Sequence, residues 1–491
     1  MNQEFKSRML RRFFGVLILV GAISFASTAA TRTITVSNIK YEIDTDDKTA
    51  VCCGPDDRSL ISGDLSIPGT VKYLGMEFTV TSIGQYAFQD CKGITGSLTF
   101  PESVTTIGEY AFRYCRGFTG TLTLPASATS IGHYAFDECS GFTGSLTLPA
   151  SVTSIGRYTF HNCSGFTGTL TLPESLTTID ESAFSGCRGF TGSLTIPNSV
   201  TTIGYEAFQN CSGFTGTLTI PSSATTIGRY AFQNCSGFTG TLTLPESVTT
   251  IGRGVFQNCR GFTGLLTIPE SVTAVEEYAF SGCSGFTGTL TLPASLPTIE
   301  KRAFEGCSGF TGTLTLPESV TTIGNSAFSG CSGFTGTLTI PKSVTKIEEQ
   351  TFYGCENLTG IELSSNIKSI AQYAFDRCSS LKKVKYLAEE PCAAGTNIFN
   401  SSVYENATLY VLNTSVLKYL ETSPWSYFKN IEMMDADGNV VSGITDIYED
   451  ADAKVEVYSL SGLKLNIASR ADLENLAPGI YIINGVKTLV K

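Results

Sequence analysis

The feature that most constrains this chain is a 24-residue unit that repeats through its middle section. The sixteen residues GFTGTLTLPESVTTIG stand at 237–252 and return, letter for letter, at 309–324. Cysteine marks the period, with twelve residues spaced by 24 and a thirteenth after 23: Cys91, Cys115, Cys139, Cys163, Cys187, Cys211, Cys235, Cys259, Cys283, Cys307, Cys331, Cys355 and Cys378. Units of this length fold by stacking on their neighbours, so the pattern predicts a solenoid.

The apolar positions within one unit are sharply defined. Leu242 and Leu244 alternate with Thr241 and Thr243, which is the period of a short strand with one buried face. Stacked copies place leucine on leucine and phenylalanine on phenylalanine, with strands about 4.8 Å apart. About 13 rungs of 23–24 residues then form a β-rich solenoid on the order of 60 Å long, with its short strands on one face.

One unit near the end of the array is a residue shorter than the others. Ile361 follows Leu358 at +3, whereas Leu242 follows Phe238 at +4. The difference falls within the T-G-T segment, where glycine can absorb a bulge. The 24-residue unit is therefore interpreted as a 23-residue unit with one inserted residue.

The repeated unit resembles the BspA-type bacterial leucine-rich repeat, in which S-V-T-x-I-G, A-F and Cys recur together. The resemblance implies a curved leucine-rich-repeat solenoid over 81–381, an N-terminal cap at 31–80 and a C-terminal capping module at 382–432. A hairpin-like insertion is expected within the N-terminal cap, between the repeat's proline and its isoleucine. The only tryptophan, Trp425, is expected to close the end of the core.

Both ends carry segments outside the repeats. Residues 1–30 are interpreted as a signal peptide, because basic residues precede a short apolar run and small residues follow it. Residues 440–491 contain KVEVYSLSGLKLN and LAPGIYIINGVKTLVK, which are typical of strands joined by glycine turns. This segment resembles the small β sorting domain of type IX secretion in Bacteroidota; the alternative is a small β tail that caps or links. We expect a protein secreted from, or displayed on the outer surface of, a bacterial cell.

Composition argues against several other functions. The net charge of −11 disfavours nucleic acid as a partner. No later apolar stretch approaches the length of a membrane span, so no membrane insertion is expected after signal removal. His133 and His161 occupy different places in their units and are interpreted as solvated surface residues. No G-x-S-x-G elbow, P-loop or H-E-x-x-H motif occurs, so no enzyme, cofactor or metal site is expected. DADGN at 435–439 is interpreted as a turn and not as a calcium loop.

The repeated cysteines leave two alternatives open. One thiol per rung, always in the same environment, favours reduced and buried side chains. Scattered disulfides are the alternative, since export permits them, although parallel side chains suit poorly the twist of about 90° that the bond requires. Cys52 and Cys53 lie outside the stack, beside a predicted turn, and are the better candidates for oxidation.

Exposed positions of the repeat supply a candidate binding face. Threonines that flank the inward leucines are expected to align into two columns: Thr217, Thr219, Thr241, Thr243, Thr289 and Thr291. Threonine suits an exposed strand in any case; the functional alternative is a flat, neutral face for a glycan or protein. Positions that precede A-F vary between units and add aromatic and charged groups: Arg229, Tyr230, Glu277, Tyr278 and Arg302.

The sequence therefore predicts a monomeric, non-catalytic binding or adhesion protein. The family resemblance implies that its partner is a host extracellular-matrix or surface protein, a glycan or another cell. The alternative is a structural spacer or surface-layer element with no specific ligand. The two differ in whether the repeat region binds any partner at all.

Overall fold

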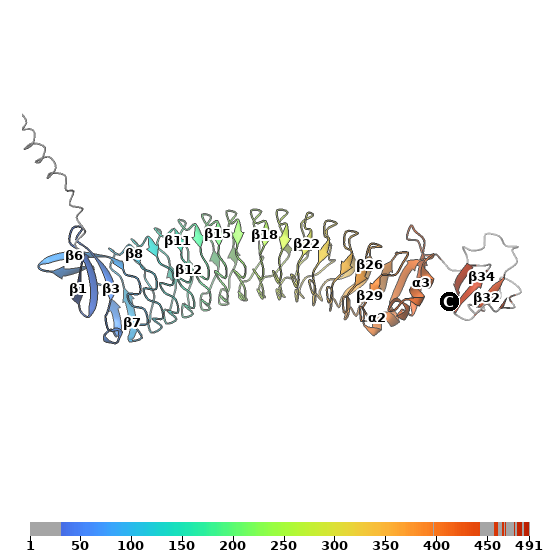
Figure 1. The fold of residues 1–491 in the computed structure, drawn as a ribbon, viewed down its shortest axis with the longest axis horizontal. Helices are drawn as coiled ribbons and strands as arrows, with labels where there is room; N and C mark the ends of the chain where they lie inside the picture. The colour runs from blue at the N-terminus through green and yellow to red at the C-terminus, as the bar shows by residue number, and fades with distance from the viewer. Residues whose placement is uncertain are drawn as a thin grey trace, which may run out of the picture.

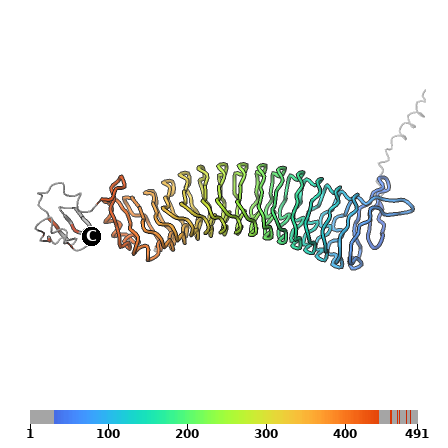
Figure 2. Tube along the Cα trace, turned by 180° about the vertical axis from the view of Figure 1, so that it is seen from behind, coloured from blue at the N-terminus to red at the C-terminus, as the bar shows by residue number. Residues whose placement is uncertain are grey.

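A computed structural model describes residues 31–441 except 396, together with 456–459, 464–465, 467, 476, 479–483 and 486–490. The described chain winds into a curved β-solenoid of about 15 turns with almost no helix (Figure 1). The predicted fold class is confirmed. There are more turns than the expected 13 because the segments at both ends continue the parallel pairing of the repeats. Figure 2 shows the successive turns side by side along the whole array.

The predicted L-x-L strands form an interrupted parallel ladder, which is a row of separate short sheets along the array. Leu194 pairs with Leu218 and Thr195 with Thr219, so identical residues of successive units face each other. This register buries every leucine of the ladder and leaves the threonine beside it exposed. The strands are Leu146–Thr147 (β10), Leu170–Thr171 (β12), Leu194–Thr195 (β14), Leu218–Thr219 (β16), Leu266–Thr267 (β19), Leu290–Thr291 (β21), Gly336–Thr339 (β24) and Leu358–Leu363 (β26).

A second parallel ladder, which the sequence did not predict, runs through the S-V-T-T-I part of the unit. The sequence predicted short strands on one face of the solenoid, whereas the structure has them on two. Thr202 pairs with Thr226 and Ile203 with Ile227, because alternating β-branched residues bury isoleucine and expose threonine. The strands are Thr106–Ile107 (β8), Ser130–Ile131 (β9), Ser154–Ile155 (β11), Thr178–Ile179 (β13), Thr202–Ile203 (β15), Thr226–Ile227 (β17), Thr250–Ile251 (β18), Ala274–Val275 (β20), Thr298–Ile299 (β22), Thr322–Ile323 (β23), Lys346–Ile347 (β25) and Ser369–Ile370 (β27).

Stacked phenylalanine rings fill the core between the ladders. The ring of Phe232 lies parallel to those of Phe208 and Phe256, with centroid distances of 5.5 and 5.7 Å. The second column, from the G-F position, continues in the same way, with 5.2 Å between Phe214 and Phe238. These rings are fully buried. Each rung therefore depends on both neighbours for the burial of its largest side chains.

The glycine of T-G-T accommodates the inserted residue where the sequence predicted it. Gly336 has φ of 74°, a left-handed conformation that glycine adopts without a steric penalty. The parallel register between β24 and β26 shifts between Gly336 and Thr337, where the shorter unit meets the longer one. The array thus absorbs the extra residue locally and keeps Leu338 opposite Ile361.

The cysteine column lies inside the core. The Cys235 thiol donates a hydrogen bond to the carbonyl oxygen of Phe208 at 3.0 Å, and its equivalents repeat this contact along the array. Burial raises the pKa of the Cys211 and Cys283 thiols to about 12. All sixteen cysteines of the chain are free thiols in this structure. The geometry is that of reduced, buried thiols.

Cys52 and Cys53 lie close to the end of a strand, just before the bend at 56–57, so the turn predicted near them is present. Both belong to β3 (Thr49–Gly54), where alternation buries Cys52 and leaves Cys53 half-buried on the opposite face. Their side chains therefore point away from each other, which disfavours a vicinal disulfide.

Iodoacetamide added to the native protein at pH 8 should alkylate Cys53 well before any other cysteine. The thiolate is the reactive form, and burial both shields the remaining thiols and raises the pKa of those in the column. Peptide mapping by mass spectrometry would locate the label. In denaturant without reductant all sixteen cysteines should react. A lower number would show disulfides and contradict the reduced column.

The N-terminal end closes the solenoid with antiparallel strands. β1 (Thr31–Val36), β2 (Ile39–Asp44) and β3 form a meander that joins the repeat sheet through β6 (Met76–Ile83). β5 (Thr70–Tyr73) and β6 pair as a hairpin, which confirms the predicted insertion. The remaining elements are the 3-10 turn η1 (Arg58–Leu60) and β4 (Gly63–Ser66), which pairs with β7 (Ile94–Thr99).

The C-terminal end closes around Trp425. Its side chain is fully buried, and its indole N–H donates to the carbonyl oxygen of Cys392 at 3.2 Å, so the predicted plug is confirmed. DADGN forms a turn, with the Asp435 carboxylate accepting from the Asn439 backbone at 2.8 Å. The elements here are β28 (Lys383–Tyr386), β29 (Ala393–Ala394), α2 (Ser401–Asn406), β30 (Thr408–Leu412), α3 (Val416–Glu421), η2 (Trp425–Tyr427) and β31 (Asn430–Met434).

The final segment contains the predicted strands. Four of them form an antiparallel sheet in the order β33-β32-β34-β35. They are β32 (Val457–Ser459), β33 (Lys464–Leu465), β34 (Gly479–Ile483) and β35 (Val486–Val490). The predicted signal peptide, 1–30, lies outside the described residues. Within the described part of the chain, no helix has the length and apolarity to span a membrane.

Candidate binding surface

The six threonines of the candidate face lie exposed along the L-x-L ladder. Thr219 flanks Leu218, and Thr291 flanks Leu290, whose side chains are buried. Parallel pairing places Thr267 opposite Thr291, which aligns the exposed side chains into columns. The face is therefore regular and uncharged at these positions, and its use for binding stays a prediction.

A second column lies at the turn before each A-F pair, and we call it the tyrosine edge. Most of its side chains are half-buried, whereas Tyr86 is exposed and Ser182 and Ser326 are buried. Every member has a left-handed backbone with φ between 50° and 61°. Hydrogen bonds between rungs hold this conformation, as from the Tyr110 amide to the His133 carbonyl oxygen at 2.9 Å. The members are Tyr86, Tyr110, Tyr134, Tyr158, Ser182, Glu206, Tyr230, Gly254, Tyr278, Arg302, Ser326, Gln350 and Tyr373. Side chains at this column vary, whereas the core positions do not.

Four tyrosines at the start of this edge form an unbroken stack. The rings of Tyr86, Tyr110, Tyr134 and Tyr158 lie nearly parallel, with 4.8 Å between successive centroids. The Arg113 guanidinium carbon lies 5.3 Å from the Tyr110 centroid and 5.2 Å from that of Tyr134. Tyr86 is 45% exposed at the open end. The stack is a rigid aromatic strip with a cation beside it.

His161 belongs to a charged cluster next to this stack, so its interpretation as a solvated residue is wrong. Its Nδ1 lies 2.8 Å from Oδ1 of Asp137, which is only 3% exposed. Arg113 donates through Nε to the other oxygen of Asp137 at 2.8 Å. His133 is engaged too, since its Nδ1 accepts the Arg157 backbone N–H at 2.8 Å. The unit period makes positions 113, 137 and 161 direct neighbours, because each follows the A-F phenylalanine.

The same cluster offers three groups that could ligate a metal ion, although no metal site was expected. Ligand atoms of Asp137, Glu138 and His161 lie within 4.8 Å of one another. Both carboxylates already have cationic partners, however, because Arg113 pairs with Asp137 at 2.8 Å and Arg116 with Glu138 at 2.9 Å. The arrangement is that of an ion-pair network, which leaves little negative charge for a metal.

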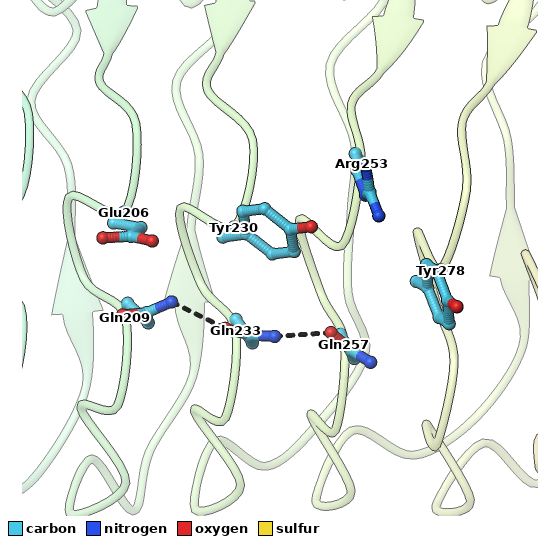
Figure 3. Close-up of a pocket in the computed structure, with 7 residues that line it drawn as sticks. All are labelled: Glu206, Gln209, Tyr230, Gln233, Arg253, Gln257 and Tyr278. Atoms are coloured by element: carbon cyan, nitrogen blue, oxygen red, sulfur yellow. Dashed lines mark hydrogen bonds between the residues drawn. The ribbon is translucent and has the colours of Figure 1, made fainter.

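A cavity of about 310 Å³ opens in the middle of the tyrosine edge (Figure 3). Its walls include Tyr230 and Tyr278, two of the predicted binding residues. Gln209 donates through Nε2 to Oε1 of Gln233 at 2.6 Å, and Gln233 donates likewise to Gln257 at 2.5 Å. The full lining is Glu206, Gln209, Tyr230, Gln233, Arg253, Gln257 and Tyr278.

The other predicted residues that precede A-F lie around the cavity. The Arg302 guanidinium carbon is 5.7 Å from the Tyr278 ring centroid. Glu277 lies 3.4 Å from the Arg253 guanidinium, and Arg229 lies 3.4 Å from Glu276. The predicted threonines are not among the lining residues. The glutamines were missed, although positions 209, 233 and 257 share one place in the unit and could have been read as a column.

Comparison with solved structures places the fold among bacterial leucine-rich repeat proteins. A leucine-rich repeat protein from Bacteroides ovatus is 26% identical, with a TM-score of 0.55, covering 72% of this chain and 94% of that one. A leucine-rich cell surface protein from Faecalibacterium prausnitzii is 23% identical (TM-score 0.44; 72% and 94%). The pneumococcal vaccine antigen PcpA is 18% identical (TM-score 0.44; 83% and 100%).

No curated protein matches the chain. The family described as BspA type leucine rich repeat region matches residues 70–191, 166–287, 212–332 and 298–432. These matches together span well over half of the sequence and include both ladders, the cysteine column and the tyrosine edge. The chain therefore belongs to the BspA-type leucine-rich repeat family.

Proposed function

We propose that this protein is secreted from, or displayed on, a bacterial cell and that it binds host matrix proteins, glycans or other cells through its exposed repeat surface. Membership of a repeat family that is typically non-enzymatic supports a binding role without catalysis.

In this proposal residues 440–491 hold the protein at the surface, and the chain acts as a monomer. Deletion of 440–491 should then change where the protein is found, and an unchanged location would leave this segment as a tail.

The observation that carries the proposal is the tyrosine stack at 86–158 with Arg113 beside it. Tyrosine and arginine supply much of the binding energy in protein interfaces, because they offer large contact areas together with hydrogen-bonding groups. Here four rings are held at 4.8 Å spacing by the backbone of successive rungs. Their order is already fixed before a partner arrives, which lowers the entropy cost of binding.

The shape of the surface indicates an extended partner. Contacts repeat along the solenoid, so a partner that follows several rungs gains one set of contacts per rung. The exposed threonines offer weak hydrogen bonds along the same axis. Because their columns are nearly identical from rung to rung, selectivity should come from the varied tyrosine edge.

Replacement of Tyr110 and Tyr134 together by alanine should weaken binding to immobilised matrix protein by at least about tenfold. The double variant removes the two central rings of the stack, which are two of the three rings on which Arg113 lies; the third, Tyr114, stays in place. The protein spanning 31–491 would be tested by surface plasmon resonance on collagen, laminin and fibronectin. Tyr373→Ala is the matched control, since it removes a tyrosine from the same column outside the stack.

Two results would count against the proposal. If Tyr373→Ala weakens binding as much as the double variant, the stack is not the contact. If the unaltered chain binds neither the matrix proteins nor any glycan of a broad panel, the structural spacer is the better interpretation. The regular, uncharged threonine columns are the observation that favours that alternative.

A further inference from the structure

We propose that the cavity between Tyr230 and Tyr278 binds one neutral hexopyranose unit of a glycan chain. The inference rests on the proposed binding function and names the ligand chemistry of one part of the tyrosine edge. It is carried by three features of that place: a missing ring, a hydrogen-bonded row of amides that ends at the cavity, and a lining without aliphatic side chains.

The missing ring is at Gly254, which occupies the tyrosine position of its rung. Its φ of 58° matches the values of 59° and 60° at Tyr230 and Tyr278, so the backbone course is unchanged. An added Cβ would lie 2.5 Å from both Cδ1 and Cε1 of Tyr230. The absence of a side chain therefore lets the Tyr230 ring lean over the next rung, as Figure 3 shows. Space remains between this ring and Tyr278, where an intact column would hold another ring.

The row of glutamines beneath this space has a direction. Each amide donates to the next, from Gln209 through Gln233 to Gln257. The row ends at Gln257, which accepts from Gln233 through Oε1 and carries its Nε2 at the Tyr278 end of the row in Figure 3. Two N–H donors are thus available at the cavity floor. A hydroxyl group of a ligand would complete the row.

The lining favours a sugar over an apolar side chain or an acid. It consists of two tyrosine rings, three amides, one guanidinium and one carboxylate, with no aliphatic residue. A pyranose ring matches this set, because its C–H face packs on an aromatic ring and its hydroxyl edge meets amides and charged groups. Glu206 and Arg253 bring opposite charges, so a neutral ligand suits the site better than an acidic one. The volume of about 310 Å³ is at the lower end for ligand sites and suits one sugar unit.

Gly254→Tyr tests the site directly, because it restores the missing ring. Every other member of this column is a residue with a side chain in the same backbone conformation, so the variant should fold. Tyr230 would return to a stacked position, and the new ring would fill the cavity. Gln350→Tyr is the matched control: it adds a tyrosine to the same column, with φ of 56° at that position, four rungs away.

Binding of cellohexaose, maltohexaose and mannohexaose to the full chain would be measured by saturation-transfer NMR and calorimetry, with sialyllactose as the acidic comparison. At least one neutral hexaose should bind the unaltered chain and the Gln350→Tyr variant with similar affinity. Its affinity for Gly254→Tyr should be lower by roughly tenfold or more. Gln257→Glu should also weaken binding, since it keeps the acceptor for Gln233 and removes both N–H donors. This second variant decides the matter if Gly254→Tyr folds poorly.

The proposal is overturned if no neutral hexaose binds, if sialyllactose binds best, or if a well-folded Gly254→Tyr binds the hexaose as tightly as the unaltered chain. Failure here is separable from failure of the proposed function. Matrix binding that depends on Tyr110 and Tyr134 but occurs without hexaose binding refutes the sugar site alone. Hexaose binding that Gly254→Tyr abolishes, with no matrix binding, supports the sugar site and removes the matrix partner.

Discussion

Replacing Phe232 with alanine should lower the local free energy of unfolding around its rung by about 3–5 kcal/mol. The side chain is fully buried and lies between the rings of Phe208 and Phe256, at 5.5 and 5.7 Å. Its loss leaves a cavity that neighbouring rungs cannot close, because backbone hydrogen bonds fix the rungs on both sides, from the Phe208 N–H to the Ala231 carbonyl oxygen at 2.8 Å and from the Phe232 N–H to that of Val255 at 3.0 Å. Both adjacent interfaces therefore lose packing at once.

Hydrogen exchange followed by mass spectrometry suits this measurement, since long repeat arrays do not unfold in a single cooperative step. Peptides spanning 208–256 should lose protection, while those near 136 and 352 should change little. Thr243→Ala in the same region is the control, and it should alter stability by no more than about 0.5 kcal/mol because the residue is exposed. A uniform loss of protection along the whole array would contradict the nearest-neighbour account.

Replacing Trp425 with alanine should destabilise the C-terminal end by about 3–5 kcal/mol. The indole is fully buried, with centroid distances of 5.2 Å to Tyr386 and 5.9 Å to Tyr419. Its N–H also satisfies the buried carbonyl oxygen of Cys392 at 3.2 Å. The variant thus removes the plug and leaves an acceptor without its partner, which together open the last turns of the core to water.

Limited proteolysis would detect this opening as new cleavage within 382–432. Tyr427→Ala is the control, because this neighbour is 51% exposed and should leave the cleavage pattern almost unchanged. If Trp425→Ala is as resistant to protease as the unaltered chain, the end of the core is closed by other residues.

The fold could be predicted in detail because each unit carries the residues that determine how it packs on its neighbours. Leucine, phenylalanine and cysteine recur at fixed places, and stacking identical units can only align like with like. The inserted residue at Gly336 was found by comparing spacings, and the buried Trp425 by its place in the final module. The second ladder was missed because its buried residues do not alternate: Val200 and Ile203 are both buried and lie three residues apart, so no strand period shows.

The surface was harder to predict, because its contacts join equivalent positions of different units. Asp137 and His161 are far apart along the chain but adjacent along the solenoid, and their contact shows only when the sequence is written one unit per line. The cavity beside Gly254 depends in addition on where the Tyr230 ring goes when its neighbour lacks a side chain. The rotamer of such a side chain depends on the room that its neighbours leave, and a repeat pattern does not specify that room.

The equal register of the rungs also makes the length of the protein adjustable. Each unit presents to the next the same ladder partners, ring position and thiol that it receives from the one before. Recombination that adds or deletes a whole unit therefore leaves every core contact and both ends intact. It changes only the distance between the two ends, and it shifts the positions of the side chains that follow along the tyrosine edge.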